Sequence, residues 1–249
     1  MPALSHARDV GVQSWSFREF KTPEALCGKL KEVGVTATEV CGVQANFDDA
    51  SQHDAPIAAL KKEGMRVFSI GVQTFTGNTA VERQWFDFAK KAGAKYISAH
   101  FQIGTYRDAI KVASGLSEAT GVKLALHCHG GYMFGGSFDV IDHIQQLGGP
   151  YVGVNIDTAW CMQAAGNPVE WVKKWGKKVY GIHYKDFTFD RAAKWTDVVV
   201  GTGNLDLPAF VAALKTGKFD GMAVIEYEAD PSNPVLALTE CIKKMRAVG

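Results

Sequence analysis

The amino-acid sequence predicts a single (β/α)8 TIM barrel that spans residues 1–249. Short apolar segments that are typical of buried parallel strands alternate with amphipathic stretches, and eight such units in 249 residues give a spacing of about 31 residues. The length is typical of this fold, and 47% hydrophobic residues are ordinary for an α/β protein. A doubly wound open sheet would show the same alternation. No GxGxxG follows the first strand, however, and eight units fit a closed barrel better.

The expected strands are short apolar runs bounded by polar or glycine-containing turns. They are Val10–Ser14, Ala37–Val40, Arg66–Ile70, Tyr96–His100, Lys123–His127, Val152–Asp157, Val179–Tyr184 and Met222–Tyr227. Helices are expected between them. Thr22 and Asn167 each precede a proline, so they are expected to cap helices that end at Glu32 and Trp175. The stretch Val81–Lys91 carries a buried stripe of aromatic residues, and a further helix begins at Asp206 and Pro208.

Charge and cysteine content restrict the function class. A net charge of +1 provides no global field that would recruit nucleic acid or an acidic membrane. Five cysteines without CxxC spacing indicate reduced thiols. No signal peptide and no apolar run of about 18 residues is present, so we expect a cytoplasmic protein. The sequence is compatible with a homo-oligomer and does not define the oligomeric state.

Four of the expected strands end in residues that bind metals or move protons: His127 with His129, Asp157, His183 and Glu226. The carboxyl ends of barrel strands meet at one face, where catalytic loops lie. Two histidines two residues apart on a strand point to the same side. Imidazole and carboxylate ligands together suit one divalent ion such as Mn, Mg, Co or Zn. A hydrogen-bonded core histidine, or a salt bridge at the barrel rim, is the structural alternative for each residue.

Other side chains near strand ends are weaker candidates. His100 ends the fourth strand and Glu39 lies in the second, and each is as consistent with a structural role as with a functional one. Lys185 could present a cation to a substrate oxygen, with Asp186 orienting it. Trp15 and Trp160 follow strand ends, where aromatic rings often stack on sugars, although core packing would also explain both.

Two glycine-containing loops could belong to the site. Gly201-Thr-Gly203 resembles a small anion-binding turn before a helix, although a lone GxG is weak support for phosphate binding. Gly130-Gly131 and Gly135-Gly136 bracket Tyr132-Met133-Phe134, which gives a loop that could fold over the site as a lid.

The sequence resembles the sugar phosphate isomerase/epimerase family of xylose isomerase-like barrels from Val10 to the C-terminus. The resemblance rests on five short segments near the ends of the expected strands or in the loops that follow them. They are His127-Cys-His129, Asn155-Ile-Asp157-Thr-Ala-Trp160, His183-Tyr-Lys-Asp186, Val200-Gly-Thr-Gly-Asn-Leu-Asp206 and Ile225-Glu226-Tyr-Glu228. Members of the family commonly bind one divalent metal through carboxylates on strands five, six and eight and a histidine on strand seven.

The resemblance implies that Asp157, His183 and Glu226 are metal ligands. His127 stands where the family has a carboxylate on strand five, so it is either the fourth ligand or a base. Trp160 replaces a histidine that often follows the strand-six aspartate. The first motif looks like the HNH or HHH of a branch that includes inosose dehydratases and enzymes of 3-keto glycosides.

The resemblance implies an isomerase or epimerase that acts on a ketose or keto-sugar through an enediolate, with a lyase of the dehydratase type as the alternative. Glu39, His129 and an unligated His127 are the candidate bases, and imidazole titrates near neutrality. Lys185 would offset charge on the intermediate. Few basic residues lie near the expected site loops, which favours a free sugar over a phosphate ester. A metal-dependent nuclease related to AP endonucleases and a non-catalytic sugar-binding barrel are the remaining classes.

Overall fold

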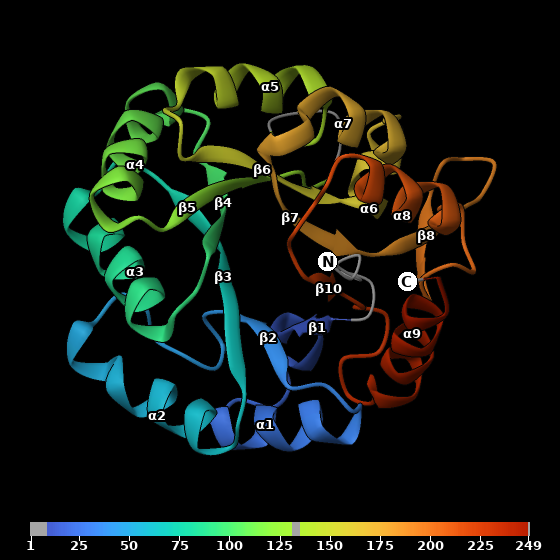
Figure 1. The fold of residues 1–249 in the computed structure, drawn as a ribbon, viewed down its shortest axis with the longest axis horizontal. Helices are drawn as coiled ribbons and strands as arrows, with labels where there is room; N and C mark the ends of the chain where they lie inside the picture. Colours follow the sequence, from blue (N-terminus) through green and yellow to red (C-terminus); the bar gives the residue numbers. More distant parts are fainter. Residues whose placement is uncertain (1–8, 131–134, 249) are drawn as a thin grey trace.

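Eight parallel strands form a closed barrel in the computed structural model, which describes residues 9–130 and 135–248. The strands follow one another around the barrel in the order β1, β10, β7, β6, β5, β4, β3, β2, and helices surround them (Figure 1). Their bounds are β1 Val10–Gln13, β2 Ala37–Val40, β3 Arg66–Phe75, β4 Tyr96–Phe101, β5 Lys123–His127, β6 Val152–Asp157, β7 Val179–Tyr184 and β10 Ala223–Ile225. The predicted (β/α)8 barrel is confirmed.

The helices of the outer ring begin and end largely where the sequence predicts. Thr22 caps α1 by accepting a hydrogen bond from the Ala25 amide, and Asn167 caps α7 in the same way. The bounds are α1 Pro23–Glu32, α2 Asp54–Lys62, α3 Thr79–Ala92, α4 Tyr106–Thr120, α5 Phe138–Leu147, α6 Thr158–Gln163, α7 Pro168–Trp175, α8 Leu207–Thr216 and α9 Val235–Val248. Short 3-10 turns occupy Ser14–Phe17, Ala50–Gln52 and Gly176–Lys178. Within the described ranges, no helix has the length and apolar character needed to cross a bilayer.

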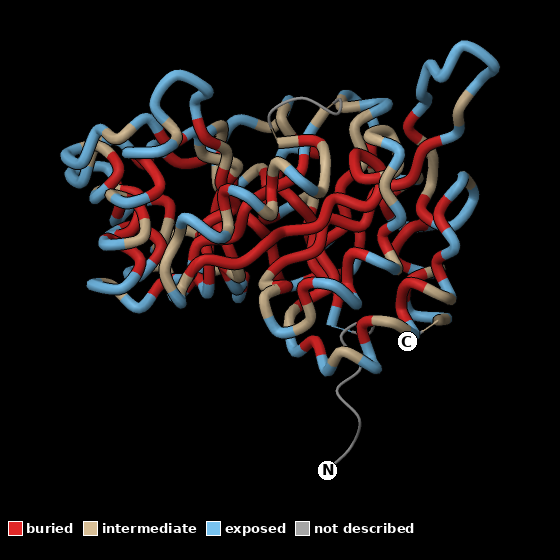
Figure 2. Tube along the Cα trace, turned by 90° about the horizontal axis from the view of Figure 1, so that it is seen from above, coloured by how far each residue is buried: buried red, intermediate tan, exposed pale blue. Residues whose placement is uncertain are grey.

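Three features of the barrel differ from the expectation. Strand β3 continues to Phe75, beyond the predicted end at Ile70, and β10 is shorter than predicted. A hairpin of β8 (Asp186–Phe189) and β9 (Trp195–Val198), which the sequence analysis did not predict, follows β7. Exposed residues at the tip of this hairpin project beyond the body of the protein (Figure 2). The sequence analysis missed this hairpin because its strands are short and contain few alternating polar and apolar residues. It also lies where the repeat of eight strand–helix units predicts only the loop between a strand and the next helix.

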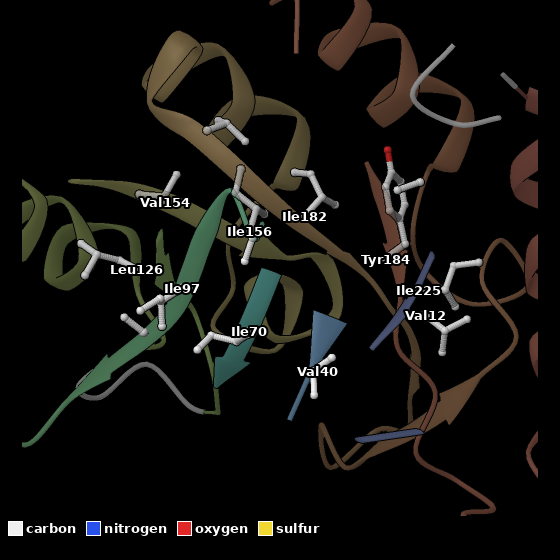
Figure 3. Close-up of a cluster of buried hydrophobic side chains, with 14 of the residues drawn as sticks. Val12, Val40, Ile70, Ile97, Leu126, Val154, Ile156, Ile182, Tyr184 and Ile225 are labelled. Carbon is white, nitrogen blue, oxygen red and sulfur yellow. The ribbon is translucent and has the colours of Figure 1, made fainter. Parts of the chain in front are cut away.

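Side chains alternate between two environments along each barrel strand. The apolar side chains in Figure 3, such as Ile156, Ile182 and Ile225, are almost fully buried. Each immediately precedes a functional candidate, namely Asp157, His183 and Glu226. Because successive strand residues point to opposite faces, the apolar residues face the helices while the polar ones face the barrel interior. Burial of the outer apolar layer therefore holds the polar residues at the strand ends inside the barrel.

The amino-terminal end of the barrel interior is closed by apolar side chains. Ala37, Met222 and Val224 form a buried cluster against Phe68, and the Phe68 ring packs edge-on against Tyr96. Gly181 leaves room for Tyr96, because a Cβ there would lie 2.6 Å from the Tyr96 ring and hydroxyl. The barrel interior is thus filled by apolar side chains at the amino-terminal end and is polar at the carboxyl-terminal end. Only the carboxyl-terminal end therefore offers groups for chemistry.

The packing at Gly181 predicts a stability difference between two glycine-to-alanine variants. Gly181→Ala should lower the free energy of unfolding by about 1–3 kcal/mol, because the new methyl group overpacks the barrel interior. Gly28→Ala, in open space on helix α1, should raise it by about 0.5–1 kcal/mol through helix propensity. Urea denaturation of both variants would measure the difference. A Gly181→Ala protein as stable as the wild type would contradict the close contact with Tyr96.

Candidate metal centre

Four buried side chains converge at the carboxyl-terminal end of the barrel: His127, Asp157, His183 and Glu226. They come from β5, β6, β7 and the residue after β10, which are consecutive strands around the barrel. One nitrogen or carboxylate oxygen from each lies within 4.8 Å of all the others. The structure therefore brings together all four residues that the sequence analysis selected as metal ligands.

The separations between these atoms fit a single small cation. His127 Nε2 lies 3.0 Å from His183 Nδ1 and 3.7 Å from Asp157 Oδ2. His183 Nδ1 is 3.5 Å from Glu226 Oε2 and 4.0 Å from Asp157 Oδ2. Ligands at about 2.0–2.2 Å from one ion lie no more than roughly 4.4 Å apart, so these pairs are within range. Two imidazoles with two carboxylates suit Zn, Mn, Fe or Co.

Asp157 has one oxygen committed to the fold and one directed into the cluster. Its Oδ1 accepts hydrogen bonds from the amides of Ala159 and Trp160, each at 3.0 Å, and so caps helix α6. Its Oδ2 is buried and has no hydrogen-bond partner among the described residues. A buried carboxylate oxygen without a partner is costly, and a cation bound between Asp157 and the two histidines would satisfy it.

Glu39 lies behind His183 instead of facing the pocket. Its carboxylate, which is fully buried, lies 3.0 Å from His183 Nε2, on the opposite side of the ring from the cluster. Three further donors hold that carboxylate, namely Gln13 Nε2 at 2.6 Å, Ser69 Oγ at 2.5 Å and Ser98 Oγ at 3.0 Å. This arrangement orients the His183 ring so that Nδ1 faces the cluster, as carboxylate partners do for metal-binding histidines. The role of Glu39 is therefore positional, and it does not line the pocket as a base would.

Burial disfavours charge on all four candidate ligands, and it prevails for Asp157 and His127. It raises the pKa of Asp157 to about 6 and, together with His183, lowers the pKa of His127 well below its usual value. Burial also acts to lower the pKa of His183, but the carboxylates of Glu39 and Glu226 outweigh it and raise that pKa. A divalent cation would favour the ionised carboxylate, which opposes the effect of burial on Asp157, and the neutral imidazole, which acts in the same direction as burial on His127.

Lys185 is buried at the edge of the cluster and is surrounded by carboxylates. Its Nζ pairs with Glu228 Oε1 and lies 3.5 Å from Glu226 Oε2 and 4.0 Å from Asp197 Oδ2. Burial alone would lower the pKa of Lys185, but Glu226, Asp157 and the other carboxylates raise it, so the side chain stays charged. With 1% of its side chain exposed, Lys185 neutralises its neighbours and is not free to contact a substrate.

A pocket of about 430 Å³ opens beside the cluster. His127 and Glu226 form its inner end, while His100, His129 and Trp15 line its walls. The ring centroids of His100 and His129 lie 5.2 Å apart, and His100 Nε2 is 3.1 Å from His127 Nδ1. Trp15 and His100, which were candidates for substrate contacts, and His129, which was a candidate base, therefore all line this pocket.

Three sequence-based interpretations need correction. Trp160 does not line the pocket but is buried between His129, Phe187 and Trp195, where it supports the β8–β9 hairpin. Asp186 does not orient Lys185.

Asp186 instead accepts hydrogen bonds from the amides of Gly201, Gly203 and Leu205. The proposed phosphate-binding turn at Gly201-Thr-Gly203 thus binds a carboxylate of the chain itself. Residues Tyr132-Met133-Phe134 of the expected lid lie outside the described residues.

Several residues of the site escaped the sequence analysis. Gln13, Ser69 and Ser98 hold Glu39, and Asp197 and Glu228 surround Lys185. For the first three, a signal exists in the sequence, because each is a polar residue in an otherwise apolar strand and occupies an inward position. Asp197 gives no such signal, since it lies on the hairpin that was not predicted.

Comparisons with known proteins identify similar sequences and structures. One relative is 3-oxo-isoapionate decarboxylase of Pectobacterium atrosepticum. The two sequences are 22% identical over 239 residues, which cover 88% of this chain and 85% of the relative. The crystal structure of 3-keto-D-glucoside 4-epimerase YcjR from E. coli is similar with a TM-score of 0.70 and 15% identity, over 96% of this chain and 99% of that one.

IOLI protein, solved with a bound zinc atom, is similar with a TM-score of 0.72 and 18% identity, over 96% of each chain. At these identities the two solved structures support the fold alone. The sequence model of the xylose isomerase-like TIM barrel, however, matches residues 27–247, which is most of the chain. The chain therefore belongs to the xylose isomerase-like TIM barrel family.

Proposed function

We propose that this protein is a divalent-metal-dependent isomerase or epimerase of a ketose or keto-sugar. The cluster of His127, Asp157, His183 and Glu226 beside a sugar-sized pocket is the observation that carries this proposal. A bound divalent cation would supply Lewis acidity to the carbonyl and neighbouring hydroxyl oxygens of a substrate. The epimerase with the same fold and the zinc-containing neighbour support a reaction of this class.

His129 is the candidate base that the geometry favours. Its ring lines the pocket, whereas Glu39 is enclosed behind His183, and Nε2 of His127 is directed into the cluster. An imidazole at this position removes the proton next to the carbonyl and leaves an enediolate. Return of the proton to the other carbon isomerises the substrate, and return to the opposite face epimerises it. His100 and Trp15 hold the sugar from the pocket walls.

A lyase is the second candidate function. The relative aligned over most of the chain is a decarboxylase, which favours it. The proton abstraction by His129 would be the same, and departure of a β-hydroxyl group as water, with the proton returned by His129, would complete a dehydration. The fate of the intermediate, and not the arrangement of the four ligands, separates the lyase from the isomerase.

Metal binding can be tested with two aspartate variants that both retain a helix cap. The wild type should bind one equivalent of Mn, Co or Zn, and Asp157→Asn should weaken metal binding at least about 100-fold. Loss of a residue that only hydrogen-bonds to a ligand already weakens metal binding by up to about 100-fold, and loss of a ligand itself should weaken it no less. Asp206→Asn is the matched control, since Asp206 caps α8 through the Ala209 amide and lies outside the cluster. Calorimetric titration of metal-stripped protein would measure the affinities. Equal affinities in both variants would contradict the assignment.

Proton exchange would test the chemistry. Metal-loaded protein in D2O with ketoses, inososes and 3-keto glycosides should introduce deuterium next to a substrate carbonyl, as detected by NMR. His129→Asn should slow this exchange by at least about 100-fold, in line with the contribution of a general base. Glu39→Gln should retain exchange at saturating metal, because Glu39 acts only through His183. The products identify an isomerase, an epimerase or a lyase.

Two results would contradict this mechanism. If exchange survived in His129→Asn and disappeared in Glu39→Gln at saturating metal, Glu39 and not His129 would be the base. If no substrate exchanged although the metal was bound, a hydrolytic or sugar-binding role would replace the proposal.

A further inference from the structure

Glu228 places a carboxylate at the wall of the pocket, two residues beyond the candidate ligand Glu226. Its Oε1 accepts a hydrogen bond from Lys185, and its Oε2 accepts one from the Trp15 indole nitrogen at 2.9 Å. The Glu228 side chain is 28% exposed, compared with 1% for Lys185. A molecule in the pocket would therefore meet the carboxylate of Glu228 and not the ammonium group behind it.

The positive groups near this pocket are already engaged. Lys185 is enclosed by Glu226, Glu228 and Asp197. The Arg18 guanidinium donates to the backbone oxygens of Trp15 and Glu228 and lies over the Trp15 ring. No lysine or arginine lines the pocket in the described part of the chain, and the sequence of 131–134, Gly-Tyr-Met-Phe, contains none.

The formal charges around the pocket remain negative when a cation is included. Carboxylates surround the single ammonium group of Lys185 from four positions: Asp157, Asp197, Glu226 and Glu228. A divalent ion bound by neutral imidazoles would leave one negative charge in excess. A phosphate or carboxylate group entering this pocket would be repelled across a short distance in a poorly solvated site.

From these observations we infer that Glu228 determines substrate specificity and restricts the pocket to uncharged polyhydroxylated substrates. This inference rests on the proposed function and adds its substrate class. The carboxylate of Glu228 accepts hydrogen bonds from sugar hydroxyl groups at the pocket wall. The same charge excludes sugar phosphates, for which no lysine or arginine lines the pocket among the described residues.

A matched pair of probes tests this specificity without knowledge of the natural substrate. Glycolohydroxamate chelates metals through two oxygens as a hydroxy ketone would, and phosphoglycolohydroxamate adds only a phosphate. Calorimetric titration of the metal-loaded wild type should give at least about tenfold tighter binding of the neutral probe. Glu228→Gln, which keeps the side-chain shape and removes the charge, should reduce this preference about tenfold.

Glu170→Gln provides a control that removes one charge from the exposed end of helix α7, and it should keep the wild-type preference. Equal or tighter binding of phosphoglycolohydroxamate by the wild type would overturn the specificity and leave the proposed function intact. An unchanged preference in Glu228→Gln would also overturn the assignment to Glu228. Absence of stoichiometric metal binding in the wild type would overturn both the proposed function and this inference.

Discussion

The burial of several carboxylates at one end of the barrel is the constraint on which the site depends. Asp157, Glu39 and Glu226 all have little or no exposed surface, and carboxylates are rarely buried without donors or cations. The chain supplies donors for Glu39 through Gln13 and two serines, and it supplies Lys185 for Glu226. For Asp157 Oδ2 no donor is present among the described residues, and a bound cation would supply the missing partner.

The barrel holds these groups in place through packing on its outer side. Ile156, Ile182 and Ile225 are buried beneath the helices, and each fixes the inward direction of the next side chain. Burial of such a side chain contributes about 1.5–3 kcal/mol, so the outer apolar layer can offset part of the cost of the polar interior. The same alternation explains why the chemistry lies only where the strands end, since apolar side chains close the amino-terminal side.

The strands and the four candidate ligands could be predicted because each strand is a short apolar run and each candidate stands at the end of one. An apolar run ending in His183 or Glu226 indicates a strand and the direction of its last side chain together. The roles of Glu39 and Trp160 could not be predicted in this way. They depend on which strands are neighbours and on a hairpin that buries Trp160. Sequence periodicity locates a side chain on a face, whereas its partner depends on closure of the barrel.

In the proposed mechanism, metal ligation and reaction outcome depend on different parts of this chain. The candidate ligands lie at the ends of strands, so a cation that they bound would determine where a substrate carbonyl is held. The direction in which a proton leaves and returns would depend on His129, which follows β5, and on the hydroxyl groups that the pocket wall orients. Glu228 forms part of that wall, and Lys185 lies between the carboxylates of Glu228 and of Asp197 on the hairpin. Substitutions in this network should therefore change which sugar is accepted, and with it the choice between isomerisation and elimination, while the metal ligands remain the same.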